Sequence, residues 1–148
     1  MDKIVTMFTN ECLQVAIIAW FIAQLIKVLT VLIKYKKFDF RRFVGAGGMP
    51  SSHSALIMSI TTAAGEIEGY SSLTFAFCLV VALIVMYDAA GVRRAAGKQA
   101  KVLNRVLEEM ENNDLKFEER LKELLGHTPI EVFAGAVLGI VIGLLKFA

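Results

Sequence analysis

Apolar residues along the chain gather into four runs that are separated by polar segments. The first run extends from Leu13 to Ile33 and contains few polar side chains. The third extends from Ser71 to Tyr87 and is rich in Val, Leu and Phe. A helix of about 20 apolar residues is long enough to cross the hydrocarbon core of a membrane. These two runs therefore predict membrane-spanning helices.

The other two runs contain many small residues. The second, from Ala55 to Gly65, is short for a full span and rich in Ser, Thr and Ala, which favours a helix packed against protein neighbours. The fourth, from Ile130 to Phe147, carries glycines at four-residue spacing, so they lie along one helical stripe. We expect a close-packing face there, formed by Gly135, Gly139 and Gly143.

A single polar stretch, at about 92–126, separates the third and fourth runs. Apolar residues recur in it at helical spacing on both sides of Asn112 and Asn113, which predicts two amphipathic helices. We expect their apolar stripes to pack on the bundle or to lie at the membrane surface. The sequence thus predicts a single all-α membrane domain over residues 1–148, with about four membrane helices, near 13–33, 51–67, 71–90 and 129–147.

Basic residues give the expected orientation of these helices. The link between the second and third runs carries Glu66 and Glu68 and no basic residue. Because Lys and Arg accumulate on the cytoplasmic side, we expect the polar turns to face the cytoplasm and both chain ends to face outside. Lys27, near the end of the first run, is expected to reach the interface. Ten of the sixteen Lys and Arg follow the first and third runs: Lys34, Lys36, Lys37, Arg41, Arg42, Arg93, Arg94, Lys98, Lys101 and Arg105.

Composition supports the membrane class. The chain is 56% hydrophobic and 20% charged, with a mean hydropathy of +0.60, whereas soluble domains are about 45–50% apolar. These values exclude a disordered chain, a collagen-like fibre and a disulfide-dense scaffold. Cys12 and Cys78 lie in apolar stretches, so we interpret them as packing residues. With a net charge of +2, no nucleic-acid partner is expected.

A glycine-rich stretch, Gly45–Ser54, opens the second apolar run. The free backbone N–H groups and the dipole at a helix start favour an anion such as phosphate. Ser51, Ser52 and Ser54 add hydroxyl groups, and His53 adds a side chain that exchanges a proton near neutral pH. The alternative is an ordinary capped helix after a flexible loop.

Two further groups of residues have both a chemical and a structural interpretation. Lys34 and Arg41 lie before the glycine-rich stretch, where they suit phosphoryl oxygens or simply set the membrane orientation. His127 and Glu131 are four residues apart, so on a helix the carboxylate would fix the imidazole tautomer. The segment from Thr128 to Glu131 is equally a capping box with proline at the first helical position.

These three groups, in this order, resemble the type 2 phosphatidic acid phosphatase family and its relatives, the bacterial non-specific acid phosphatases and vanadium haloperoxidases. That superfamily carries the motifs K-x6-R-P, P-S-G-H and S-R-x5-H-x3-D. Lys34-x6-Arg41 matches the first motif, with Arg42 in place of proline. Residues 50–53 match the second, with Ser52 in place of glycine.

The end of the third motif is matched by His127-x3-Glu131, with glutamate in place of aspartate. These departures and the small size are similar to the divergent branch of the family, and the resemblance covers Lys34 to about Gly143. The motif's arginine is out of register, because Leu121 occupies its position. The alternatives for this arginine are Arg93, Arg94 and Arg120.

The resemblance implies a reaction that needs no metal or cofactor. His127 would attack phosphorus, Glu131 would orient His127, and His53 would protonate the leaving oxygen. The implied function is a membrane phosphatase for a lipid or isoprenoid phosphate, or another phosphomonoester, acting on the cytoplasmic side. The alternative is a non-enzymatic membrane protein that retains the fold and a phosphate site. The phosphoryl oxygens would be held by Lys34, Arg41, Gly48, Ser51 and Ser52.

Overall fold

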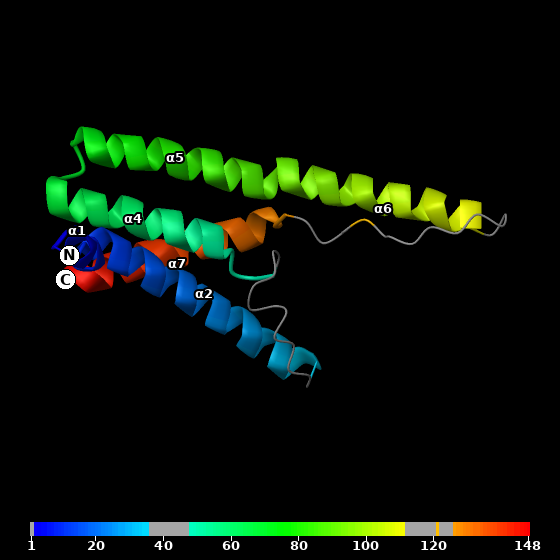
Figure 1. The fold of residues 1–148 in the computed structure, drawn as a ribbon, viewed down its shortest axis with the longest axis horizontal. Coiled ribbons are helices and arrows are strands. Elements are labelled where there is room, and N and C mark those ends of the chain that lie inside the picture. The colour runs from blue at the N-terminus through cyan, green and yellow to red at the C-terminus, as the bar shows by residue number, and fades with distance from the viewer. Residues whose placement is uncertain (1, 36–47, 112–120, 122–125) are drawn as a thin grey trace.

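A computed structural model of the chain describes residues 2–35, 48–111, 121 and 126–148, and it is built of helices, with no strand among these residues. The all-α prediction is confirmed. In chain order the described helices are α1 (Asp2–Phe8), α2 (Glu11–Tyr35), α4 (Ser52–Glu68), α5 (Leu73–Ala90), α6 (Val92–Glu111) and α7 (Pro129–Phe147) (Figure 1).

The centre of the bundle is α4, which packs against α2, α5 and α7 (Figure 1). Three helical segments are long and apolar enough to cross a membrane: Glu11–Ile33, Leu73–Met110 and Pro129–Phe147. The chain is therefore an all-α membrane bundle. The shorter α4 is not among these three segments, so a fourth span at 51–67 stays a prediction.

The glycine stripe of α7 allows its backbone to contact α4 directly. A Cβ atom at Gly139 would collide with the carbonyl oxygen of Ala55, and one at Gly143 would lie 2.6 Å from Cβ of Thr62. Both glycines are buried. The close-packing face expected from their four-residue spacing is therefore the face that meets α4.

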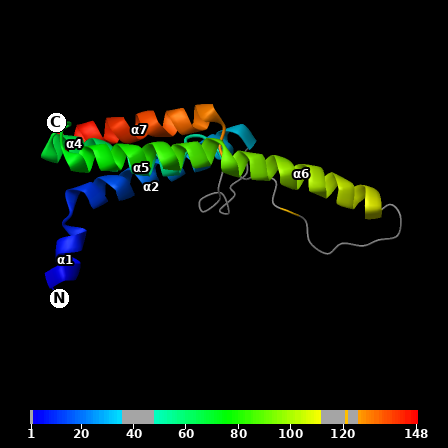
Figure 2. The same ribbon diagram turned by 90° about the horizontal axis from the view of Figure 1, so that it is seen from above.

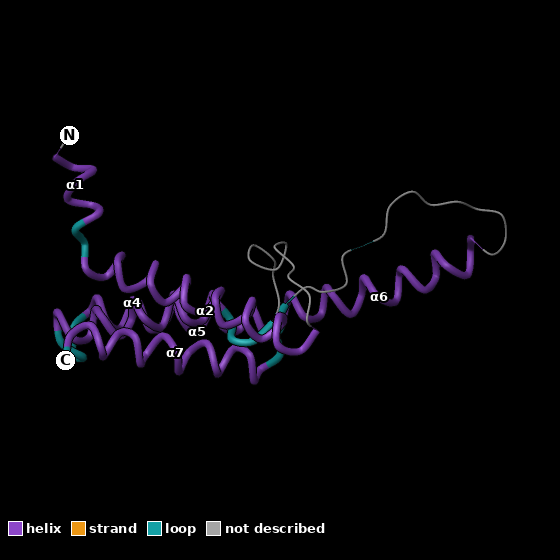
Figure 3. Tube along the Cα trace, turned by 90° about the horizontal axis from the view of Figure 1, so that it is seen from below, coloured by secondary structure: helices purple, strands orange, loops and turns teal. Residues whose placement is uncertain are grey.

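Beyond the bundle, α6 continues the direction of α5 (Figure 1), while α1 turns away from the axis of α2 (Figures 2 and 3). The first amphipathic helix expected in the polar stretch is thus present. The second falls on residues outside the described part of the chain. The amide side chain of Asn104 on α6 is buried and exchanges two hydrogen bonds with the backbone of Leu121, at 2.8 and 2.9 Å.

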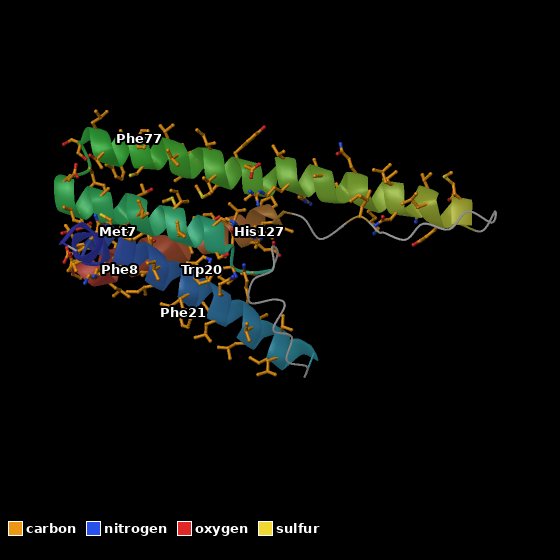
Figure 4. The ribbon with its side chains drawn as sticks, in the orientation of Figure 1. Met7, Phe8, Trp20, Phe21, Phe77 and His127 are labelled. Atoms are coloured by element: carbon orange, nitrogen blue, oxygen red, sulfur yellow. The ribbon has the colours of Figure 1, made fainter. Side chains whose placement is uncertain are left out.

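The bundle has two distinct ends. The C-terminus lies at the end of the bundle that carries the α4–α5 turn (Figures 1 and 2), whereas His127 lies at the other end, where α4 and α7 begin (Figure 4). Cys12 and Cys78 are half-buried and unbridged.

Candidate active site

Two backbone hydrogen bonds bring three segments of the chain together at the His127 end of the bundle. The N–H of Ser51 donates to the carbonyl oxygen of Glu131 at 2.9 Å, which joins the start of α4 to α7. The N–H of His127 donates to the carbonyl oxygen of Ala89 at 2.9 Å, which joins the loop before α7 to the end of α5. Residues far apart in the sequence therefore meet here.

His127 and Glu131 form the contact that their spacing predicts. His127 Nδ1 lies 3.2 Å from Glu131 Oε2, and the imidazole is only 3% exposed. With Nδ1 donating to the carboxylate, the lone pair of the neutral ring lies on Nε2. That atom is buried and makes no hydrogen bond to any described residue. The arrangement leaves Nε2 available as a nucleophile.

The same carboxylate also starts the helix. Glu131 Oε2 accepts from the N–H of Thr128 at 2.9 Å, and the N–H of Glu131 donates to Thr128 Oγ1 at 3.3 Å. This is a complete capping box with proline in the first turn. The structural and the chemical interpretations of this segment therefore hold together, because one rigid helix start fixes the carboxylate beside the imidazole.

Burial lowers the pKa of His127 below its ordinary value, since the charged ring loses hydration. The hydrogen bond to Glu131 raises this pKa, and the nearby cations of Lys27 and Arg93 lower it. The net effect keeps the ring neutral at pH 7, which is the form that a nucleophilic imidazole requires.

His53 lies at the second position of α4, and its exposed ring faces His127. The ring centroids are 6.1 Å apart and the planes are inclined at 62°. The two histidines of the chain, 74 positions apart in sequence, therefore lie next to each other. One ring is buried with a free nitrogen and the other is open to solvent, as a nucleophile and a proton donor would be.

The glycine-rich stretch ends in a capped helix start with buried hydroxyl groups. Ser51 Oγ accepts from the N–H of Ser54 at 3.3 Å, which is the N-cap of α4. Gly48 has φ +88°, a conformation that favours glycine. Ser52 and Ser54 are both buried, and Ser54 Oγ makes no hydrogen bond within the described residues.

Lys27 is a site residue that the motif spacing missed. Its side chain is 4% exposed, and its Nζ donates to Ser52 Oγ at 3.2 Å. Packing of α4 against α2 therefore buries Lys27 within the protein, and its position relative to the membrane interface stays a prediction. An ionisable residue inside a membrane helix is itself a signal of function, and this signal identifies Lys27.

The candidate arginines differ in their placement. Arg93 Nε donates to Asp88 Oδ2 at 2.7 Å. The positive charge of Arg93 affects the pKa of both histidines. Arg94 is exposed, and its backbone nitrogen lies against Gly126, where a Cβ atom would collide with it. Arg93 is thus the arginine whose charge lowers the pKa of His127. Arg41, Arg42 and Arg120 lie outside the described residues, as does the side chain of Lys34.

No three His, Cys, Asp or Glu side chains converge as metal ligands within the described ranges. The metal-free reaction stays a prediction, and so do the roles of the site residues.

Comparison with known proteins gives the family. The sequence profile described as "Divergent PAP2 family" matches residues 8–142. The chain is similar to "Uncharacterized membrane protein YuiD" of Bacillus subtilis (strain 168), with 40% identity over 149 aligned residues, 93% of this chain and 94% of that protein. No solved structure matches the chain. Because the profile match covers most of the chain, the chain belongs to the Divergent PAP2 family.

Proposed function

We propose that the protein is a membrane phosphatase that hydrolyses a lipid phosphate, or another phosphomonoester, through a phosphohistidine intermediate. The observation that carries the proposal is the His127 imidazole. Its Nδ1 is held by Glu131, its Nε2 is buried without a hydrogen-bond partner among the described residues, and its ring faces His53.

In the first step, His127 Nε2 attacks the phosphorus atom and the bond from phosphorus to the ester oxygen breaks. The departing oxygen takes a proton from protonated His53, and the alcohol leaves. As the imidazole gains positive charge, the carboxylate of Glu131 stabilises the ring through Nδ1–H. The exposed position of His53 suits contact with a leaving group on the solvent side.

In the second step, water attacks the phosphohistidine. Neutral His53 accepts a proton from this water, the bond from phosphorus to Nε2 breaks, and inorganic phosphate is released. Both histidines return to their starting protonation states, so no other reactant is needed. The 6.1 Å between the ring centroids lets one phosphoryl group contact both rings.

Three groups support binding of the phosphoryl oxygens. The start of α4 supplies free backbone N–H groups, the buried Lys27 supplies a cation beside Ser52, and Arg93 supplies a second cation. Positioned charges of this kind stabilise the negative charge of phosphoryl transfer. We assign this role to Lys27 as well, and the role of Lys34, whose side chain lies outside the described residues, stays a prediction.

The position of the site in the bundle favours an amphiphilic substrate. The site lies at one end of the membrane helices, next to the junction of α5 and α6 (Figure 4). A headgroup at that level would reach His127 while its tail stayed among the lipids. The basic residues that begin α6 lie at this end, and Glu66 and Glu68 lie at the other. The proposed side is therefore the cytoplasmic one.

The test is phosphate release by purified full-length protein from a panel of lipid and isoprenoid phosphates in dodecyl maltoside. We expect release with at least one substrate and none with His127→Ala. Lys98→Gln, which changes an exposed cation on α6, is the matched control and should retain full activity. Equal turnover by His127→Ala would contradict the mechanism.

Non-enzymatic phosphate binding is the second candidate. The observation that favours it is Ser52, which takes the glycine position of the P-S-G-H motif and engages Lys27. Under this alternative the wild-type protein binds orthovanadate, a phosphate analogue, but releases no phosphate from any substrate in the panel. Binding together with turnover rejects it.

A further inference from the structure

Asp88 and Arg93 form an ion pair across the junction of α5 and α6. Arg93 Nε lies 2.7 Å from Asp88 Oδ2, and both side chains are about half-exposed. In a regular helix, residues five apart point about 140° away from each other, so such a pair does not normally form. The pair therefore depends on the shape of this junction.

Gly91 gives the junction its shape. Its φ of −101° and ψ of −83° are not helical values, and a Cβ atom there would lie 2.9 Å from the carbonyl oxygen of Tyr87. Helical hydrogen bonds nevertheless continue on both sides, from Gly91 N to Tyr87 O at 2.8 Å and from Ala95 N to Gly91 O at 2.9 Å. Hydrogen bonding therefore continues across Gly91, while its non-helical φ and ψ change the relative directions of the side chains before and after it, so that Asp88 reaches Arg93.

The same junction supports the loop that carries His127. The carbonyl oxygen of Ala89 accepts from the N–H of His127 at 2.9 Å, and Gly126 packs against the backbone of Arg93 and Arg94 so closely that no Cβ would fit. Gly126 itself has φ +82°, which favours glycine. Arg93 therefore begins α6 in direct contact with the backbone that places His127.

The ion pair also lies close to the second histidine. The positive charge of Arg93 and the negative charge of Asp88 have opposite effects on the pKa of His53. Arg93 also lowers the pKa of His127. Because the backbone of Arg93 lies against Gly126, the residue before His127, its side chain starts next to the histidine pair. The ion pair with Asp88 constrains the direction of the guanidinium.

We propose that Asp88 is a positioning residue, which holds Arg93 through Nε so that the remaining guanidinium N–H groups face the phosphoryl oxygens. This inference rests on the proposed function. A guanidinium has five N–H donors in a rigid plane, so one carboxylate at Nε leaves the Nη groups for a second anion. Asp88 thereby lowers the conformational freedom that Arg93 would lose on binding phosphate.

The opposite role makes the opposite prediction. If Asp88 competed with phosphate for Arg93, removing its charge would release the guanidinium and strengthen anion binding. If Asp88 positions Arg93, removing its charge weakens anion binding. The direction of the change thus separates the two roles without reference to turnover.

The experiment measures binding of orthovanadate and of inorganic phosphate to the full-length protein in dodecyl maltoside, by calorimetry. For Arg93→Gln we expect binding about tenfold weaker, because a hydrogen bond to a charged group is lost. For Asp88→Asn we expect binding about fivefold weaker, an effect in the range of contacting pairs. Asp88→Glu should recover part of the loss, and Glu68→Gln, an exposed acid at the far end of α4, should bind as the wild type does.

A double variant distinguishes positioning from a general structural role. Because Asp88 acts through Arg93, Asp88→Asn/Arg93→Gln should bind no more weakly than Arg93→Gln alone. Additive losses would assign Asp88 a role independent of Arg93 and overturn the inference. Melting curves recorded without anion show whether each variant is folded.

The outcomes also separate this inference from the proposed function. If the wild type binds orthovanadate and Asp88→Asn binds it equally well or more tightly, the positioning role is wrong and the proposed function stands. If the wild type binds neither anion, the proposed function fails, and the role of Asp88 fails with it.

Discussion

The middle and the first turn of α4 carry the same kinds of side chain in very different states. In the middle, Ser59, Thr61 and Thr62 donate to carbonyl oxygens of their own helix, at 2.8–2.9 Å. In the first turn, Ser52 contacts a buried lysine, and Ser54 Oγ is buried without a hydrogen bond among the described residues. In the middle of α4 the hydroxyl groups therefore hydrogen-bond to their own helix. In its first turn they contact another helix or have no hydrogen bond among the described residues.

Polar side chains that support packing and those that are available to a ligand therefore differ in whether their hydrogen bonds are satisfied within the protein. An unsatisfied buried polar atom costs about 1–3 kcal/mol, so its presence needs an explanation. Two such atoms, Ser54 Oγ and His127 Nε2, lie at the first turn of α4, where the buried ammonium of Lys27 contacts Ser52. No such cluster is found in the middle of the helix, within the described residues. The cluster is the arrangement expected of a site that holds an anion.

Of the variants considered, Lys27→Met should impair the site at the first turn of α4 the most. Removing the cation should lower kcat/KM by about a hundredfold or more, the range seen when a group that stabilises transition-state charge is lost. Stability should be unchanged or higher, because methionine of similar length carries no charge into the membrane helix. Kinetics and thermal melting of the same preparation check both parts. Loss of folding without a specific kinetic defect would assign Lys27 a structural role.

Gly139→Val should disturb the packed middle and leave the chemistry of the site intact. Its Cβ would collide with the carbonyl oxygen of Ala55, so α7 must move away from α4. Overpacking of this kind typically costs about 1–3 kcal/mol. Thermal melting measures the loss of stability. Gly69→Ala is not a suitable control, because Gly69 has φ +90° and a side chain there would itself be strained. Val141→Ala, at an exposed position of α7, is the matched control.

Glu131→Gln should shift the pH dependence of the reaction. Glu131 raises the pKa of His127 through its hydrogen bond and its charge, so the substitution lowers that pKa further. The acidic limb of kcat/KM, where His127 becomes protonated and inactive, should then move to lower pH than in the wild type. The substrate titrates identically in both assays. A limb that stays in place would show that His127 is not the group that titrates.

The smallest effects should come from single hydroxyl groups of α4. Thr61→Val removes a hydroxyl that is satisfied within its own helix, so activity should be unchanged and stability should fall by about 1 kcal/mol or less. Ser54→Ala removes a buried hydroxyl that has no hydrogen bond among the described residues, so it should not reduce stability. If Ser54 contacts the anion, the variant should bind orthovanadate a few-fold more weakly. Equal binding by both variants would exclude Ser54 from the site.

Local patterns predicted much of the fold and part of the site. The apolar runs predicted the helices, the glycine spacing predicted the face of α7 that meets α4, and the i,i+4 spacing predicted the contact of His127 with Glu131. Each of these depends on residues within one helix. Local periodicity is sufficient for such features.

The missed features depend on contacts between distant segments. Motif spacing pointed to Lys34, whereas packing of α4 against α2 buries Lys27 beside Ser52. The charge of Arg93 lowers the pKa of His127 because the junction of α5 and α6 packs against the His127 loop, which comes from far along the chain. No periodic signal encodes these contacts, because the tertiary arrangement of the helices creates them.

The central claim is that His127 becomes phosphorylated. The most direct measurement is phosphorus NMR of the protein during turnover of a lipid phosphate, with acid and alkali treatment of the trapped species. We expect a phosphoprotein that is labile to acid and stable to alkali, present in the wild type and absent in His127→Gln. A phosphorylated His127→Gln protein, or turnover by it at the wild-type rate, would contradict this mechanism.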